Sequence, residues 1–195
     1  MNVNPPAARA ALLLASASPR RRDLLKKAGV DFRVEAARTE ELAGGEWTAR
    51  EVCLLNAEQK ALDVASRFPD CVVLGADTVV SLEGQVFGKP ADFDKARAML
   101  EMLCGRVHEV LTGVCLVQKR ERKLFRFVES TRVKFRSRQA VDLEDYLRSV
   151  HPLDKAGGYA AQEDQGRLIE YIEGSMSNVI GLPVERVLAA FNEHF

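Results

Sequence analysis

Basic and hydroxyl side chains gather in one short stretch near the start of the chain. Residues 16–22, SASPRRR, join an apolar run to a leucine-rich segment with helical spacing. That order predicts a turn between a strand and a helix, where free backbone N–H groups and the helix dipole attract an anion. The hydroxyl of Ser16 and the guanidinium forks of Arg20 and Arg21 suit phosphate oxygens. The turn is a candidate phosphate cradle, although a capped helix with solvated arginines would account for the same residues.

A carboxylate closes a later apolar run, VVLGAD, at Asp77. Ligands of α/β sheets bind where strand ends face a crevice, and a carboxylate there can hold a divalent cation or activate water. The other interpretation is that Asp77 caps the turn into the following TVV. Glu40 and Glu41 add carboxylates in a polar loop, where on their own they are expected to be solvated.

Two further segments carry polar side chains in places typical of loops. Lys89 stands in a GKP turn, where a compact positive charge suits phosphate, although by itself it also fits a plain surface lysine. Residues 154–162, DKAGGYAAQ, belong to a loop of a length that is often functional. Gln162 offers the donor and the acceptor needed to read the edge of a base. Tyr159 is expected to pack over the loop rather than to act in catalysis.

These groups together comprise cations that attract phosphate, carboxylates that can hold Mg²⁺ and an amide that can read a base. Such a set suits a nucleotide substrate, because Mg²⁺ commonly binds through one or two carboxylates together with substrate phosphates. A serine hydrolase is disfavoured because no histidine stands near a candidate nucleophile. A Walker-type NTPase is disfavoured because the chain has no GxxxxGK[ST] motif. The cysteines form no CxxC pair and the histidines are scattered, which disfavours a zinc site.

Local patterns predict the elements that must position these groups. Strands are expected over residues 12–15, 31–37, 71–77 and 167–174, long β-rich stretches over 108–118 and 123–136, and a hairpin over 78–88. Helices are expected from Pro19 to Gly29, from a Thr48–Glu51 capping box towards Phe68, from Asp92 to about Cys104, from Asp142 to Val150, and from Pro183 onward. Residues 174–181 are expected to form a loop. The alternation predicts an α/β fold, a mixed twisted sheet with flanking helices.

The overall composition limits the partners. The 195-residue chain has 28 basic and 28 acidic residues and therefore no formal net charge. Broad attraction to nucleic acid or to an anionic membrane is not expected. No apolar run nears the roughly 20 residues of a membrane span. Because the cysteines lie within apolar runs, a reducing compartment and a cytoplasmic location are expected.

The same residues resemble the Maf family of nucleoside triphosphate pyrophosphatases. The matching motifs are LASASPRRRDLL, TEE, NAEQKA, LGADTVV, GKP, HPLDKAGGYAAQ and GLPVERV, in the family's order from about Leu12 to Phe191. Several separate motifs in order are far more specific than any one of them. The resemblance implies a single Maf-like domain over residues 1–195, with two lobes around a deep cleft, related to the inosine-triphosphate pyrophosphatases.

The resemblance also implies a reaction and a role for each matching side chain. Members hydrolyse a nucleoside triphosphate between the α- and β-phosphates, with Mg²⁺ or Mn²⁺, and release the monophosphate and pyrophosphate. Asp77 would be the catalytic acid or base, and Glu41 and Asp77 would lie near the metal. The substrate-binding residues would be Ser16, Arg20, Arg21, Lys60, Thr78, Lys89 and Gln162. Members are often dimers, so a homodimer is among the expected forms.

Within the family, the motifs resemble the dTTP/UTP branch, in which Arg20, Thr78 and Gln162 would set specificity. The branch acting on 7-methyl-GTP typically shows SPWR, SDQV and a KSEG-like loop, whereas this chain has SPRR, ADTV and YAAQ. The loop AGGYAAQ departs from the common AGAYGIQ, and EGSMSNVIGLP differs from several members. Modified pyrimidine nucleotides stay open as substrates.

A second class of function is also open. A non-enzymatic, nucleotide-binding regulator of cell division or septum formation would need the phosphate cradle but not Asp77. If the arginines of the cradle serve a triphosphate, neutralising Arg20 or Arg21 should weaken stabilisation by nucleotide without harming the free fold.

Overall fold

The computed structural model describes residues 10–42 and 45–195. In that part of the chain, seven strands form a sheet of order β2-β1-β3-β5-β6-β7, with β4 paired to β3. The strands are β1 (Leu12–Leu14), β2 (Phe32–Val34), β3 (Val72–Leu82), β4 (Gln85–Phe87), β5 (Val107–Gln118), β6 (Lys123–Phe135) and β7 (Ile169–Glu173). The α-helices are α1 (Pro19–Lys27), α2 (Ala49–Arg67), α3 (Phe93–Leu103), α4 (Leu143–Ser149), α5 (Met176–Ile180) and α6 (Val184–His194). The predicted α/β class is confirmed.

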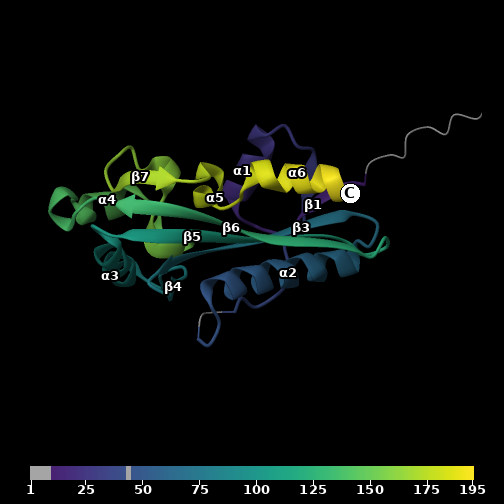
Figure 1. Ribbon diagram of the computed structural model, residues 1–195, viewed down its shortest axis with the longest axis horizontal. Coiled ribbons are helices and arrows are strands. Elements are labelled where there is room, and N and C mark those ends of the chain that lie inside the picture. Colours follow the sequence, from purple (N-terminus) through teal and green to yellow (C-terminus); the bar gives the residue numbers. More distant parts are fainter. Residues whose placement is uncertain (1–9, 43–44) are drawn as a thin grey trace, which may run out of the picture.

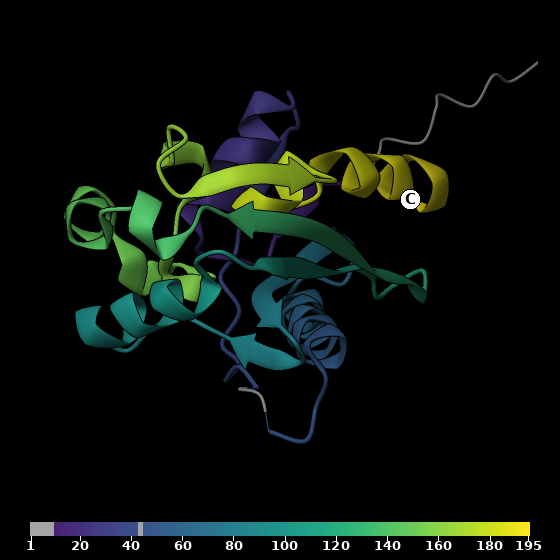
Figure 2. The same cartoon turned by 60° about the vertical axis from the view of Figure 1, so that its left-hand side comes forward.

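The sheet is mixed because its two halves are connected differently. β1 lies parallel to both β2 and β3, as expected where helices link the strands. The remaining pairs are antiparallel, and β5 and β6 form a long hairpin. Helix α2 covers one face of the sheet, and α1 and α6 cover the other (Figures 1 and 2).

Strand β3 is longer than predicted, and this changes the setting of Asp77. Within β3, β1 pairs only with Val72–Leu74, but β3 continues to Leu82 and pairs with β5 as far as Ser81. The prediction that the strand ends at Asp77 is therefore wrong, whereas the predicted hairpin is confirmed by the antiparallel pairing of the end of β3 with β4. Asp77 lies inside β3, just past the point where β1 ends, because residues 78–81 continue the ladder with β5. The turn at Glu83-Gly84 is confirmed, and both residues have positive φ.

Helix α2 lies directly on the backbone of the sheet. A Cβ atom at Gly75 of β3 would stand 2.1 Å from the carbonyl oxygen of Ala57, and one at Gly113 of β5 would stand 2.3 Å from that of Cys53. Only glycine at these two positions allows so close an approach. The capping box predicted at the start of α2 is present, with Thr48 accepting from the Glu51 N–H and Glu51 accepting from the Thr48 N–H.

Two predictions for local elements are corrected. Residues 174–181 do not form only a loop, because Ser175 caps the short helix α5 by accepting from the Asn178 N–H at 3.1 Å. The strand predicted over 31–37 is limited to Phe32–Val34, since its partner β1 is itself only 3 residues long. Among the described helices, none has the length and apolar character needed to cross a membrane.

The apolar core is divided along the sheet. One cluster, which includes Leu14, Leu74 and Val187, packs α1 and α6 against the β1 end. Another, which includes Val80 and Phe135, joins the far end of the sheet to α3, α4 and the loop before β7. Between them, β3 and β5 carry polar side chains, and a pocket opens there.

Candidate active site

The pocket between the two clusters has a volume of about 800 Å³. Nine of its lining residues are those singled out from the sequence: Ser16, Arg20, Arg21, Glu41, Lys60, Asp77, Thr78, Lys89 and Gln162. They come from the turn before α1, the first turn of α1, the loop before α2, the body of α2, β3, the turn after β4 and the loop before β7. The fold therefore brings together every side chain that the sequence proposed for the site.

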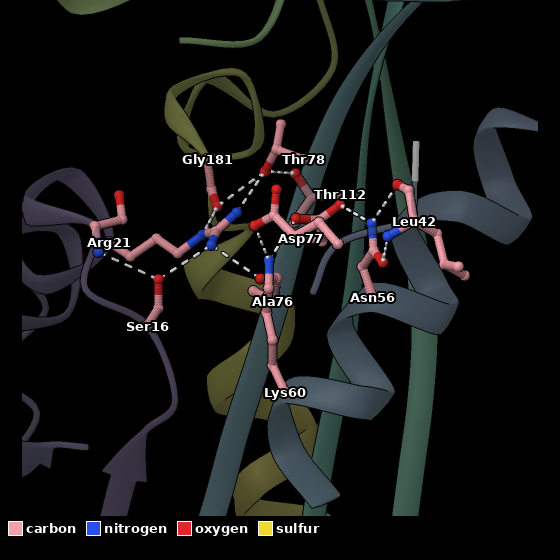
Figure 3. A network of polar contacts seen from close by, with 12 residues as sticks. Ser16, Arg21, Leu42, Asn56, Lys60, Ala76, Asp77, Thr78, Thr112 and Gly181 are labelled. Atoms are coloured by element: carbon pink, nitrogen blue, oxygen red, sulfur yellow. Dashed lines mark hydrogen bonds and ion pairs between the residues drawn. The ribbon is translucent and has the colours of Figure 1, made fainter. Parts of the chain in front are cut away.

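The carboxylate of Asp77 is held by two side chains from one face of α2. Lys60 Nζ lies 2.7 Å from Asp77 Oδ1, and Asn56 Nδ2 donates to Asp77 Oδ2 at 3.1 Å (Figure 3). Asn56 and Lys60 are one helical turn apart, so both point to the same spot on β3. Each carboxylate oxygen of this buried aspartate thus has its own donor.

Glu41 shares the ammonium group of Lys60 with Asp77. Its Oε1 accepts from Lys60 Nζ at 2.6 Å. Partial burial raises the pKa of Glu41, but the hydrogen bond and charge of Lys60, with the charges of Lys89 and Arg21, outweigh it and lower the pKa overall. The glutamate is therefore an ionised group facing the pocket.

Arg21 is buried, and the protein already uses most of its donors. Nε donates to the Gly181 carbonyl at 2.8 Å, and Nη1 donates to Ser16 Oγ at 3.1 Å and to the Ala76 carbonyl at 2.8 Å. Nη2 donates to Thr78 Oγ1 at 3.0 Å (Figure 3). Four of the five N–H groups are thus engaged. Burial lowers the pKa of Arg21, and the charge of Asp77 opposes that shift.

Arg20 takes a different direction from its neighbour and reaches the loop before β7. It donates to Asp154 Oδ2 at 2.6 Å and to the Asp154 carbonyl at 2.9 Å. The other oxygen of that carboxylate accepts from Lys155 Nζ at 2.8 Å. Asp154 therefore links an arginine of α1 to a buried lysine of the loop, although it is itself half exposed.

Lys89 and Gln162 stand at the rim of the pocket. Lys89 is exposed, and within the described residues no hydrogen bond or ion pair holds its ammonium group. The Nε2 atom of Gln162 donates to Glu163 Oε1 at 3.2 Å. Tyr159 of the same loop is buried and its hydroxyl contacts His108 Nε2 at 3.0 Å, so its predicted packing role is confirmed.

Two groups that hold the site are not among the residues predicted from the sequence. Asn56 occurs in the motif NAEQKA, but the motif alone gave it no role. Its spacing of four residues from Lys60, on one helix face, was the signal that could have identified it. Thr112 of β5, 2.9 Å from Thr78 Oγ1, gave no such signal, because its partner is fixed only by strand register.

The donor set suits a hard divalent cation that is shared with a substrate. Glu41 and Asp77 offer carboxylate oxygens, which Mg²⁺ and Mn²⁺ prefer. In residues 10–42 and 45–195, no group of three or more His, Cys, Asp and Glu side chains is arranged to hold a metal ion. The two carboxylates therefore fit a cation whose coordination is completed by phosphate oxygens and water.

Comparison with known proteins identifies the group to which these features belong. The family described as Maf-like protein matches residues 11–194. A dTTP/UTP pyrophosphatase of Pelotomaculum thermopropionicum is 43% identical over 90% of this chain and 92% of its own length. Those of Akkermansia muciniphila and Myxococcus xanthus are 43% and 46% identical, over 93% and 91% of this chain and 95% and 89% of their own lengths. The chain belongs to the Maf-like protein family.

Proposed function

We propose that this protein hydrolyses dTTP and UTP between the α- and β-phosphates, releasing the nucleoside monophosphate and pyrophosphate. One observation carries the proposal. Asp77 lies at the base of a pocket lined with cations, and Asn56 and Lys60 fix both of its oxygens. The names of the relatives, which match over most of their length, support the choice of substrates.

In this proposal, Asp77 orients the attacking water and accepts its proton. A general base needs a fixed direction as well as a free lone pair. Each oxygen of Asp77 accepts one hydrogen bond from α2, which leaves lone-pair capacity for a water molecule. Lys60 keeps the neighbouring carboxylates of Glu41 and Asp77 from repelling one another.

Glu41 and Asp77 would hold the divalent cation. When bound, Mg²⁺ or Mn²⁺ would offset the negative charge that develops on the phosphate oxygens. The protein would supply further positive charge from Lys89, which has no ion-pair partner among the described residues, and from Arg20 once Asp154 releases it.

The proposal gives Arg21 a positioning role. Its bonds to Ser16, Ala76 and Gly181 tie the turn before α1 to β3 and to the residue after α5. One N–H group is left for a phosphate oxygen. Thr78 and Gln162 are proposed to face the pyrimidine base.

A panel of triphosphates tests the function. We expect dTTP and UTP, with Mg²⁺ or Mn²⁺, to give pyrophosphate and the monophosphate faster than CTP, ATP, GTP or 7-methyl-GTP. Asp77→Asn should lower kcat at least about 100-fold while the circular dichroism spectrum stays unchanged. Asp63→Asn, a change on α2 that leaves the pocket untouched, is the control.

The same panel decides between the enzyme and the regulator. If the wild-type protein binds dTTP but releases no pyrophosphate with either metal, the proposed reaction is wrong and nucleotide binding alone is its function.

We also propose a cytoplasmic setting, since all four cysteines are free. Burial raises the pKa of Cys53 and Cys115 to about 12, which keeps these thiols protonated and unreactive.

A further inference from the structure

The oxygen and both N–H groups of the Asn56 side-chain amide form hydrogen bonds that join two parts of the site. Its Oδ1 accepts from the Leu42 N–H at 2.8 Å, and its Nδ2 donates to the Leu42 carbonyl at 3.1 Å. The other N–H of the same nitrogen donates to Asp77 Oδ2 at 3.1 Å. The residue is only 2% exposed; its bond to Asp77 is buried, and its two bonds to Leu42 are partly buried. Such a buried and fully paired amide fixes the groups around it.

Leu42 directly follows Glu41 in the chain, so Asn56 acts on both carboxylates of the site. It contacts Asp77 through its side chain and holds Glu41 through the backbone of the next residue. Lys60, one turn further along α2, makes a second connection between the same two carboxylates, at 2.6 Å and 2.7 Å. Two side chains of one helix face therefore cross-link β3 to the loop before α2.

The two connections differ in what would happen to them during the reaction. The ammonium of Lys60 occupies carboxylate oxygens that a divalent cation would also use, and it is attracted to phosphate. The bonds of Asn56 to Leu42 involve backbone atoms that no cation or phosphate has to displace. Asn56 can therefore keep the separation of the carboxylates fixed when Lys60 changes partner.

We infer that Asn56 is a positioning residue that sets the distance between Glu41 and Asp77, so that one divalent cation can be shared by both. The inference rests on the proposed function, because that function requires the shared cation. Residues that hydrogen-bond to metal ligands and orient them typically contribute 10- to 100-fold to metal affinity or activity. Asn56 meets this description through hydrogen bonds to one ligand and to the backbone beside the other.

The test compares Asn56→Ala and Asn56→Asp with the wild-type protein. Asn56→Ala removes all three hydrogen bonds. Asn56→Asp has nearly the same shape and can still accept from the Leu42 N–H, but it loses both donors and faces Asp77 with a like charge. The control is Asp63→Ala, which removes another contact from α2 to the preceding loop, the acceptor of the Arg38 N–H at 3.1 Å. Thermal unfolding establishes that each variant is folded.

Binding of Mn²⁺ is measured without turnover, from the electron paramagnetic resonance signal of free Mn²⁺ in the presence of α,β-methylene-dUTP. We expect both Asn56 variants to bind Mn²⁺ at least about 10-fold more weakly than the wild type, and Asp63→Ala to stay within about twofold. At saturating Mn²⁺, kcat for dTTP should still be reduced at least about 10-fold, whereas KM changes less than about threefold.

Three results have different meanings. Wild-type Mn²⁺ affinity in either folded Asn56 variant, alongside an active wild-type enzyme, would overturn the inference and leave the proposed function intact. Loss of stability with unchanged Mn²⁺ affinity and unchanged kcat would likewise show that Asn56 is structural only. A wild-type protein that releases no pyrophosphate from any triphosphate would instead overturn the proposed function.

Discussion

The cations of the pocket differ in how firmly the protein itself already holds them. Arg21 donates to four acceptors and is buried, Arg20 is paired with a half-exposed carboxylate, and Lys89 has no ion-pair partner within the described residues. A ligand can bind Lys89 without breaking any contact to another described residue. To bind Arg20 it must displace the ion pair and the hydrogen bond to Asp154. Arg21 is the hardest to recruit, because most of its donors are already bonded. The three side chains are therefore expected to respond differently to substitution.

Arg21→Ala is expected to destabilise the protein without ligand. The change leaves the buried Ala76 carbonyl oxygen without its donor, at about 1 to 3 kcal/mol. It also removes the shorter of the two hydrogen bonds to the Gly181 carbonyl, which keeps only the Thr78 hydroxyl at 3.3 Å. We expect the free energy of unfolding in urea to fall by about 3 kcal/mol. This revises the sequence-based expectation that neutralising this arginine leaves the free fold unharmed. Arg20→Ala, measured in parallel, should cost less than about 1 kcal/mol, and equal losses for the two variants would contradict the argument.

Lys89→Ala is expected to impair the reaction without affecting the fold. Its ammonium group is exposed and holds no other described residue, so the free energy of unfolding should change by less than about 0.5 kcal/mol. If Lys89 contacts the triphosphate in the transition state, kcat/KM for dTTP should fall about 100-fold. Lys95→Ala, an exposed lysine of α3 outside the pocket, is the control. An unfolded or fully active Lys89→Ala would each contradict the role.

At the scale of the elements, the site depends on how closely α2 approaches the sheet. Asn56 and Lys60 reach Asp77 because the helix backbone contacts Gly75 and Gly113. A side chain at either glycine would push α2 away from β3 and carry both donors with it. The geometry of the carboxylates thus depends directly on the packing of α2 against the sheet.

Gly75→Ala and Gly113→Ala are therefore expected to damage both stability and activity. The new Cβ would stand 2.1 Å or 2.3 Å from a helix carbonyl oxygen, which the backbone can relieve only by moving. Overpacking of this kind typically costs 1 to 3 kcal/mol, so we expect a loss of about 2 kcal/mol or more in urea unfolding. Gly88→Ala, with nothing within 4 Å of the added carbon, is the control for stability. Unchanged stability in the first two variants would show that the helix can slide.

Local signals predicted the elements well, and long-range pairing explains what they missed. The Thr48–Glu51 capping box and the Asp92 cap act within four residues, so the starts of α2 and α3 followed from sequence. The position of Asp77 inside β3 depends on β5, whose register the sequence of β3 does not contain. For the same reason, motifs identified the site residues but predicted neither the bonding of Lys60 to both carboxylates nor the hydrogen bonds that hold Arg21.

At the scale of the whole molecule, the pocket separates two apolar clusters that are joined through β3 and β5. The cluster at the far end contains a histidine, His108 of β5, packed edge-on against Phe135 and Tyr159. His108 is 1% exposed, and its Nδ1 is buried without a hydrogen-bond partner in the described residues. Burial lowers its pKa to about 4, since a charged ring there would lose its hydration.

This histidine makes the stability of the far end depend on pH. Because the pKa of His108 is about 4 in the folded protein and about 6.5 in the unfolded chain, the unfolded chain binds the proton first. The contribution to stability is therefore complete above about pH 6.5 and is lost as the pH falls towards about 4, by up to about 3 kcal/mol. Urea unfolding at intervals between pH 7 and pH 4.5 measures it. His108→Gln keeps a partner for the Tyr159 hydroxyl but cannot titrate. Between pH 7 and pH 4.5, its free energy of unfolding should therefore fall less than that of the wild type, by most of the contribution of His108. If the free energy of unfolding fell equally with pH in the two proteins, the loss of stability in acid would come from the carboxylates and not from His108.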